Sequence, residues 1–202
     1  RVPCFLDSPM ASKVSEITCR HAKEHDESMR RATEKGRCPL CSGRFEILET
    51  PEASKSLNRR EGPFLVIAGS GMATGGRVLH HLERRLGDPR TTVLLPGFQA
   101  AGTRGRSLLE GAEFLKMHGR LVPVKAKVEV LDGLSAHADR EGILRWLAGF
   151  RSPPRRTYVV HGESEAASAL ASSIRGQLGW TVDVARDSEV VTLAALPLVP
   201  AV

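Results

Sequence analysis

The chain has 202 residues and a formal net charge of +6 at neutral pH, with 29 Lys and Arg against 23 Asp and Glu. This length suffices for one or two domains with ordinary cores, and the basic balance favours a polyanionic partner such as nucleic acid. No apolar run approaches the roughly 20 residues needed to cross a bilayer. With four unevenly spaced cysteines and no signal-peptide pattern, we expect a cytoplasmic protein without a disulfide framework.

Short apolar runs alternate with helical patterns along the chain. Strands are expected at residues 2–7, 64–68, 91–95, 157–160 and 181–185, with two more inside 119–131. Helices are expected at residues 11–33, 77–86, 106–109, 140–149 and 163–178, and an irregular polar segment up to residue 61. Ser8 and Pro9 are a plausible helix N-cap and first helical residue. The alternation predicts an α/β fold with a layered, mainly parallel sheet.

Two histidines stand where a predicted strand ends. His137 lies in Leu-Ser-Ala-His-Ala-Asp at 134–139, and His161 lies in Val-Val-His-Gly-Glu-Ser at 159–164. An imidazole titrates near neutral pH and is also a common metal ligand. By spacing alone, the pair is either a proton donor and a ligand of one centre or two partly buried histidines without a chemical role.

A glycine-rich loop at 69–76 separates a predicted strand from a predicted helix. Such a loop lets backbone amides approach an anion, and the following helix N-terminus adds a positive dipole. The loop is neither a phosphate-binding Walker loop nor a dinucleotide-binding fingerprint, because the lysine and the glycine spacing are absent. On its own it is equally consistent with a tight turn.

Arginines cluster at three places in the chain. The clusters are Arg84, Arg85 and Arg90; Arg104 and Arg106; and Arg151, Arg155 and Arg156. A planar guanidinium pairs well with phosphate oxygens, so the clusters support nucleic-acid binding. For any single arginine, solubility is the simpler explanation.

Two further groups have the residue types of metal ligands. Cys38 and Cys41, with Cys19 or His21 from outside, would give a structural zinc site, but one CxxC pair is a weak signature and reduced thiols are favoured. His21 and His25 lie four apart, yet alanine occupies the position where a zinc-protease helix needs glutamate. We expect these histidines on a solvated helix face.

Six blocks occur in the order found in one nuclease family. They are Asp-Ser-Pro-Met-Ala at 7–11, Ala-Ser-Lys-Ser-Leu-Asn at 53–58, Ala-Gly-Ser-Gly-Met-Ala-Thr-Gly-Gly-Arg at 68–77, Gly-Phe-Gln-Ala-Ala-Gly-Thr at 97–103, Ser-Ala-His-Ala-Asp at 135–139 and His-Gly-Glu at 161–163. The chain therefore resembles the β-CASP branch of the metallo-β-lactamase superfamily, which comprises RNA- and DNA-processing nucleases related to ribonuclease J. Leu134 stands where many relatives have phenylalanine.

The resemblance implies a domain division near Val124. Residues 1–124 would form the β-CASP domain, residues 125–195 the returning segment of the metallo-β-lactamase αββα domain, and residues 196–202 a tail. The family's His-x-His-x-Asp-His segment is absent from these 202 residues. We therefore expect a C-terminal portion of a longer enzyme, whose exposed apolar surface would need the missing half or another copy of the chain.

The resemblance also assigns roles to individual residues. His161 matches a ligand of the family's two-zinc centre, and His137 matches the residue that contacts the scissile phosphate and protonates the leaving oxygen. Asp139 either orients His137 or caps the following helix. The residues expected to bind RNA are Ser70, Gly71, Thr74, Gly75, Gly76, Arg77, Gly102, Thr103, Arg106 and Ser135.

The predicted function is a zinc-dependent nuclease that processes single-stranded RNA, in which this portion alone is inactive. A two-zinc centre supplies a hydroxide at neutral pH and stabilises displacement at phosphorus. The alternative is a nucleic-acid-binding or scaffold member of the same fold without catalysis. Retention of both histidines favours the enzyme, because an inert relative need not keep them.

Overall fold

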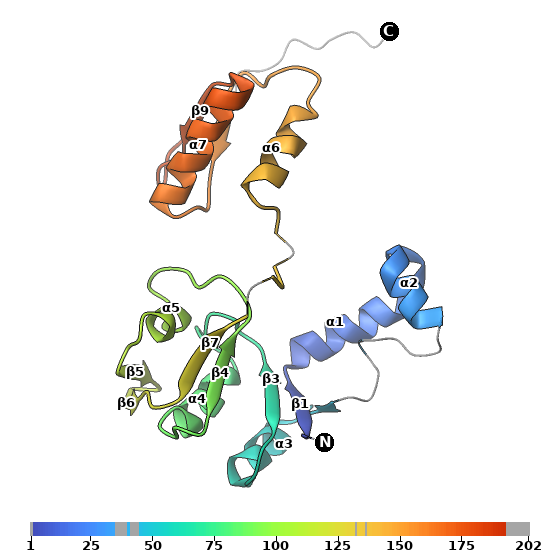
Figure 1. Ribbon diagram of the computed structural model, residues 1–202, viewed down its shortest axis with the longest axis vertical. Helices are drawn as coiled ribbons and strands as arrows, with labels where there is room; N and C mark the ends of the chain where they lie inside the picture. The colour runs from blue at the N-terminus through green and yellow to red at the C-terminus, as the bar shows by residue number, and fades with distance from the viewer. Residues whose placement is uncertain (1, 35–39, 41–44, 132, 136, 193–202) are drawn as a thin grey trace. The chain divides into compact units, whose positions relative to one another are not determined.

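The computed structural model describes residues 2–34, 40, 45–131, 133–135 and 137–192. The chain divides into two compact units, Arg1–Ser135 and Ala136–Val202 (Figure 1). Parallel pairing dominates the described strands, with one antiparallel hairpin, which confirms the predicted α/β fold. In the described ranges, no helix combines the length and apolarity that a membrane crossing requires.

The first sheet of unit 1 is parallel with the strand order β2-β1-β3. Its strands are β1 (Cys4–Asp7), β2 (Glu46–Ile47) and β3 (Leu65–Ala68). Phe5, Leu48 and Leu57 form a small buried core beside it, and the Phe5 ring meets Phe64 edge to face at 6.0 Å. The outward side chains of β3 are half exposed, so this apolar strand buries only one of its faces.

The helix expected at 11–33 is in fact three helical segments. They are α1 (Pro9–Arg20), η1 (Ala22–Glu24) and α2 (Glu27–Glu34). Ser8 caps α1 as expected, since its hydroxyl accepts the amide of Ala11 at 3.3 Å. The continuous helix was wrong because Asp26 begins a new one, where its carboxylate accepts the Met29 amide at 2.7 Å.

The segment before residue 61 was wrongly expected to be irregular. Besides β2, it contains α3 (Pro51–Ser56) and η3 (Leu57–Arg59). Thr50 accepts the amide of Ala53 at 3.1 Å and Pro51 opens the helix, so the start follows the same capping chemistry as Ser8 and Pro9. Leu57 then turns inward and becomes one of the buried core residues.

The rest of unit 1 packs around a second parallel pair, β4 (Thr92–Leu95) with β7 (Lys127–Val130). The hairpin β5 (Phe114–Met117) and β6 (Arg120–Pro123) lies beside α5 (Arg104–Leu109), and α4 (Val78–Arg85) contributes to the same core (Figure 1). That core includes Leu82, Leu86, Leu108 and Met117. Strand β5 was missed from the sequence, whereas β6 and β7 are the two strands expected inside 119–131.

Unit 2 is a small layered α/β unit. Its elements are α6 (Arg140–Ala148), β8 (Thr157–Val159), α7 (Ser164–Leu178) and β9 (Val182–Val184), with β8 and β9 paired in parallel. Ala171 and Ile174 of α7 are almost completely buried against Leu144, Leu147 and other apolar residues. Gly179 caps the C-terminus of α7, and its φ of 67° is the left-handed conformation common at this position.

The histidine and cysteine expectations near α1 need correction. His21 is exposed at the end of α1, but His25 is buried, and its Nε2 lies 2.7 Å from the main-chain oxygen of Thr18. Cys19 is disulfide-bonded, which contradicts the reduced thiols favoured for this group of cysteines, while Cys4 is a free thiol. The zinc interpretation of Cys38 and Cys41 falls outside the described residues.

Candidate functional site

Arg77 belongs to a buried polar network around Asp7, at the end of β1. The Asp7 side chain is 0% exposed and accepts hydrogen bonds from Ser54 Oγ at 2.6 Å, Arg77 Nη1 at 2.6 Å and His81 Nε2 at 2.6 Å. The Arg77 guanidinium also donates to the main-chain oxygens of Leu48 and Glu49. The network therefore links β1, α3, α4 and the chain following β2.

The electrostatics of Asp7 follow from these contacts. Burial by itself would raise the pKa of this carboxyl, but the hydrogen bonds from Ser54, Arg77 and His81 outweigh burial and hold the pKa below its ordinary value. An ionised, fully buried carboxylate needs such partners. Arg77 therefore stabilises the fold through Asp7. The RNA contact expected of Arg77 stays a prediction.

The glycine-rich loop between β3 and α4 is held by hydrogen bonds to the side chain of Ser70. Ser70 has a φ of 71°, and its hydroxyl accepts the amides of Thr74 at 3.2 Å and Gly75 at 3.3 Å. The Thr74 hydroxyl lies 3.0 Å from the same oxygen. Two of the amides expected to face RNA phosphate thus already have a partner, whereas the Thr74 side chain and Gly76 are exposed.

A second loop, at residues 97–103, is joined directly to the first. The buried Gln99 donates from Nε2 to the main-chain oxygens of Gly71 at 3.1 Å and Gly97 at 3.0 Å. The Gly105 amide donates to the Met72 oxygen at 3.0 Å, and a Cβ at Gly105 would lie 1.7 Å from Gln99 Oε1. Glycine is required there because the two loops approach so closely.

These loops and the β5–β6 hairpin surround one open cavity of ≈ 490 Å³. Three residues expected to bind RNA line it: Thr74, Gly102 and Thr103. The remaining lining residues are Arg104, Ser107, Phe114, Leu115, Lys116 and Leu121. Phe114 and Leu121 are 56% and 71% exposed, so the wall offers apolar surface next to two cationic side chains.

Several arginines of the predicted clusters are held by the protein itself. Arg85 donates to the Leu57 oxygen at 2.5 Å and lies over the Phe64 ring at 4.6 Å. Arg106 pairs with Glu110 at 2.6 Å, and Arg156 pairs with Asp183 at 2.7 Å. Their positions are therefore explained by contacts within their own units, and their contribution to RNA binding stays a prediction.

His161 occupies the turn between β8 and α7. It is exposed and has a φ of 63°, which places a non-glycine residue in the left-handed region. The next residue must be small, because a Cβ at Gly162 would lie 3.1 Å from the Cβ of Ala167 in the first turn of α7. The His-Gly pair thus makes a tight turn that fixes the backbone of His161.

His137 is exposed and lies shortly before α6. Asp139 caps that helix, since its Oδ1 accepts the Gly142 amide at 2.7 Å, which is the capping alternative expected for this residue. Helices α6 and α7 pack side by side, and Figure 1 shows their N-terminal ends facing the same way. The two histidine segments therefore lead into neighbouring helices of one unit, while Ser135 is the exposed last residue of the other unit.

Comparison with known families explains this set of blocks. Residues 1–108 match the Beta-Casp domain, and residues 121–185 match the Zn-dependent metallo-hydrolase RNA specificity domain. The chain belongs to the β-CASP family. Membership confirms the resemblance drawn from the sequence blocks, and both histidine segments lie inside the second matched region.

Curated relatives of this β-CASP chain have names connected with RNA. It is 39% identical over 179 residues to a ribonuclease of Thermus thermophilus, covering 88% of this chain and 41% of the relative. It is 30% identical over 183 residues to the transcription termination factor FttA of Methanosarcina mazei, covering 88% of this chain and 29% of the relative. Integrator complex subunit 11 of Danio rerio is 31% identical over 157 residues, or 77% of this chain and 26% of the relative. The chain thus spans less than half the length of these proteins.

Residues from different β-CASP blocks lie together in the folded chain. Asp7, Ser54 and Arg77 come from three separate blocks and meet in the buried network. Sequence analysis missed Lys116 as a cavity residue, because the strand that carries it was not predicted. The domain division near Val124 stays a prediction. The two compact units of the fold divide at a different place, after Ser135.

Proposed function

We propose that this chain serves a zinc-dependent RNA-processing nuclease, to which it contributes an RNA-binding surface, one zinc ligand and a proton donor. The observation that carries the proposal is the backbone of His161, held at a φ of 63° after β8 in the block that matches the family's ligand. Non-glycine residues in this conformation are uncommon and cluster at functional sites. Membership in a family with ribonuclease-named relatives supports the reaction type.

The donor set decides what the chain can do with zinc. Within the described residues, no group of three candidate ligands includes His161. A catalytic zinc takes three protein ligands, so one imidazole does not hold a zinc pair. We therefore propose that further ligands come from a His-x-His-x-Asp-His segment, which these 202 residues do not contain, and that the chain alone does not cleave RNA.

The proposed RNA surface is the cavity between the glycine loops and the hairpin. Lys116 would contact phosphates beside Arg104, whose Nε already donates to the Lys116 main-chain oxygen at 2.8 Å. The exposed Phe114 ring offers a face on which a base can stack. Thr74, Gly102 and Thr103 lie on the same wall. The surface suits single-stranded RNA because stacking requires unpaired bases.

His137 would donate a proton to the leaving oxygen. Its exposed position before α6 allows contact with a bound strand, and an imidazole can hold or release a proton near neutral pH. Asp139 fixes the start of α6 through its cap and thereby restrains the chain that carries His137.

A chimera tests the proposal. The matched region of the Thermus ribonuclease is replaced by this chain, and cleavage of single-stranded RNA is measured with zinc present and after chelation. We expect zinc-dependent cleavage by the chimera and none by the isolated chain. A folded chimera that binds RNA but never cleaves it would favour the non-catalytic scaffold alternative, and robust zinc-dependent cleavage by the isolated chain would contradict the ligand argument.

A further inference from the structure

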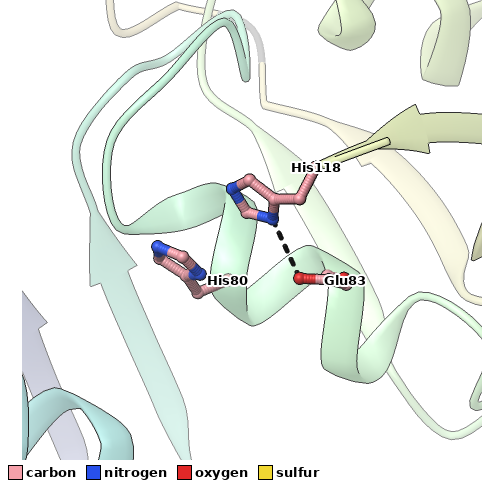
Figure 2. Close-up of side chains that lie close together, drawn as sticks. All are labelled: His80, Glu83 and His118. Atoms are coloured by element: carbon pink, nitrogen blue, oxygen red, sulfur yellow. Dashed lines mark hydrogen bonds and ion pairs between the residues drawn. The ribbon is translucent and has the colours of Figure 1, made fainter. Parts of the chain in front are cut away.

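Three side chains with metal-binding groups converge on the outer side of α4, in unit 1. His80 and Glu83 lie three residues apart on this helix and therefore share a face. His118 reaches them from the turn between β5 and β6, and Figure 2 shows all three side chains gathered over the helix. Among the described residues, this is the group whose three candidate ligand atoms lie within 4.8 Å of one another.

The contacts inside this group already hold its ligands close together. His118 Nδ1 donates to Glu83 Oε2 at 2.9 Å, and this hydrogen bond lowers the pKa of the Glu83 carboxyl. The rings of His80 and His118 stack with centroids 4.6 Å apart and planes at 19°. The Glu83 carboxylate is thus ionised at neutral pH beside two imidazoles, each of which offers a nitrogen lone pair when neutral.

The hairpin turn presents His118 in a left-handed backbone conformation. His118 and Gly119 are the two loop residues between the paired Met117 and Arg120, with φ of 46° and 80°. Positive φ at both positions defines a type I′ turn, where asparagine followed by glycine is the preferred sequence. Histidine is one of the non-glycine residues found most often at positive φ, so the turn can direct an imidazole toward α4.

We infer that His80, Glu83 and His118 form a binding site for a divalent transition metal, with Zn²⁺ as the ion that this donor set suits best. Two imidazoles and one carboxylate match zinc, whereas Mg²⁺ and Ca²⁺ prefer oxygen ligands throughout. Zinc bonds of about 2.0–2.2 Å place ligand atoms roughly 3.5 Å apart, so the more distant pairs must close by about 1 Å. The exposed His80 and the 39% exposed His118 side chain have room to make this movement.

The bound ion would connect α4 to the β5–β6 hairpin. The same hairpin carries Phe114 and Lys116 of the cavity wall, so metal binding would fix this wall relative to α4. The positive charge of Arg120 also lowers the pKa of the Glu83 carboxyl, which helps to keep this candidate ligand ionised. The inference does not rest on the proposed function, because none of the three residues belongs to the nuclease blocks.

The test is Zn²⁺ binding to the 202-residue chain, measured by calorimetry and by amide chemical shifts. We expect Zn²⁺ to shift the amides around His80, Glu83 and His118, and to raise the melting temperature of the chain. His118→Asn is the sharpest variant, because asparagine suits the turn and preserves the hairpin while the ligand is lost. It should weaken binding by more than the roughly 10–100-fold that loss of a supporting hydrogen bond costs at a metal site.

Two further variants and one control complete the experiment. Glu83→Gln and His80→Ala should each weaken Zn²⁺ binding in the same way, so the test stands even where one variant folds poorly. His21→Asn removes an exposed histidine of the same unit and should retain the shifts around α4. Wild-type affinity in the three site variants, or an absence of Zn²⁺-induced shifts at these residues, would overturn the inference.

Discussion

Replacing Arg77 by alanine should destabilise unit 1 selectively. The change removes a hydrogen-bonded charge 2.6 Å from a carboxylate that is 0% exposed, together with two donors to main-chain oxygens. Breaking a buried ion pair by removing one partner costs about 3–5 kcal/mol. Because the Arg77 side chain is 19% exposed and water can reach the vacated place, we expect about 2–4 kcal/mol.

The positions of the tryptophans allow the unfolding of the two units to be followed separately. Trp146 and Trp180 are the two tryptophans of the chain, and both lie in unit 2. Far-UV circular dichroism reports both units, whereas tryptophan fluorescence reports unit 2. At about 2–4 °C per kcal/mol, the dichroism transition of unit 1 should fall by about 4–16 °C in Arg77→Ala, while the fluorescence transition stays in place.

Arg84→Ala is the matched control, because it removes the same charge from an exposed position of α4. We expect a change within about 0.5 kcal/mol for this variant. Equal melting of Arg77→Ala and wild type in dichroism would refute the network argument. A shift of the fluorescence transition by the same amount would show that the mutation does not act on unit 1 alone.

Three further predictions concern pH, packing and RNA. The folded pKa of Asp7 lies below the unfolded value of about 3.9, so its contribution to stability is present at neutral pH and is lost as pH falls below about 4. When unfolding is measured between about pH 7 and acid pH, Asp7→Asn should lose less stability than wild type. Gly105→Ala should destabilise unit 1 by about 1–3 kcal/mol in urea unfolding, because the added Cβ collides with the buried Gln99. Gly71→Ala is the control and should leave stability nearly unchanged, because a Cβ there has no atom within 4 Å. Affinity for single-stranded RNA should fall steeply with salt, and Arg106→Ala, like Lys116→Ala, should reduce the log–log salt slope by about one without changing sequence preference; an affinity that does not vary with salt would contradict the electrostatic interpretation.

The sequence predicted the fold best where its signals were local. Ser8 with Pro9, the apolar run before the glycine loop and the segments from residue 140 onward follow capping and periodicity rules that act over a few residues. The same kind of signal was overlooked at Asp26, which starts α2, and at Thr50, which starts α3. Strand β5 was missed because Lys116 is the single polar residue among its four, which is too little for an alternating pattern.

The sites were less predictable because they join distant residues. Asp7 and His81 are 74 positions apart, and Glu83 and His118 are 35 apart, so no periodicity connects them. The resemblance assigned RNA-binding residues to both glycine-containing loops, and the cavity brings Thr74, Gly102 and Thr103 together but does not include Arg106. What the sequence could not reveal is that Ser70 and Arg77 direct their polar groups into the protein.

Metal analysis of two histidine variants in the zinc-loaded chimera tests the central claim most directly. His161→Ala should lower both zinc content and RNA cleavage, because a ligand is lost. His137→Ala should retain zinc content and slow single-turnover cleavage by about 10²–10⁴-fold, the usual contribution of a proton donor. Equal zinc loss in both variants would contradict the role of His137, and full zinc content with an unchanged rate in His161→Ala would contradict the account of this chain as part of a zinc nuclease.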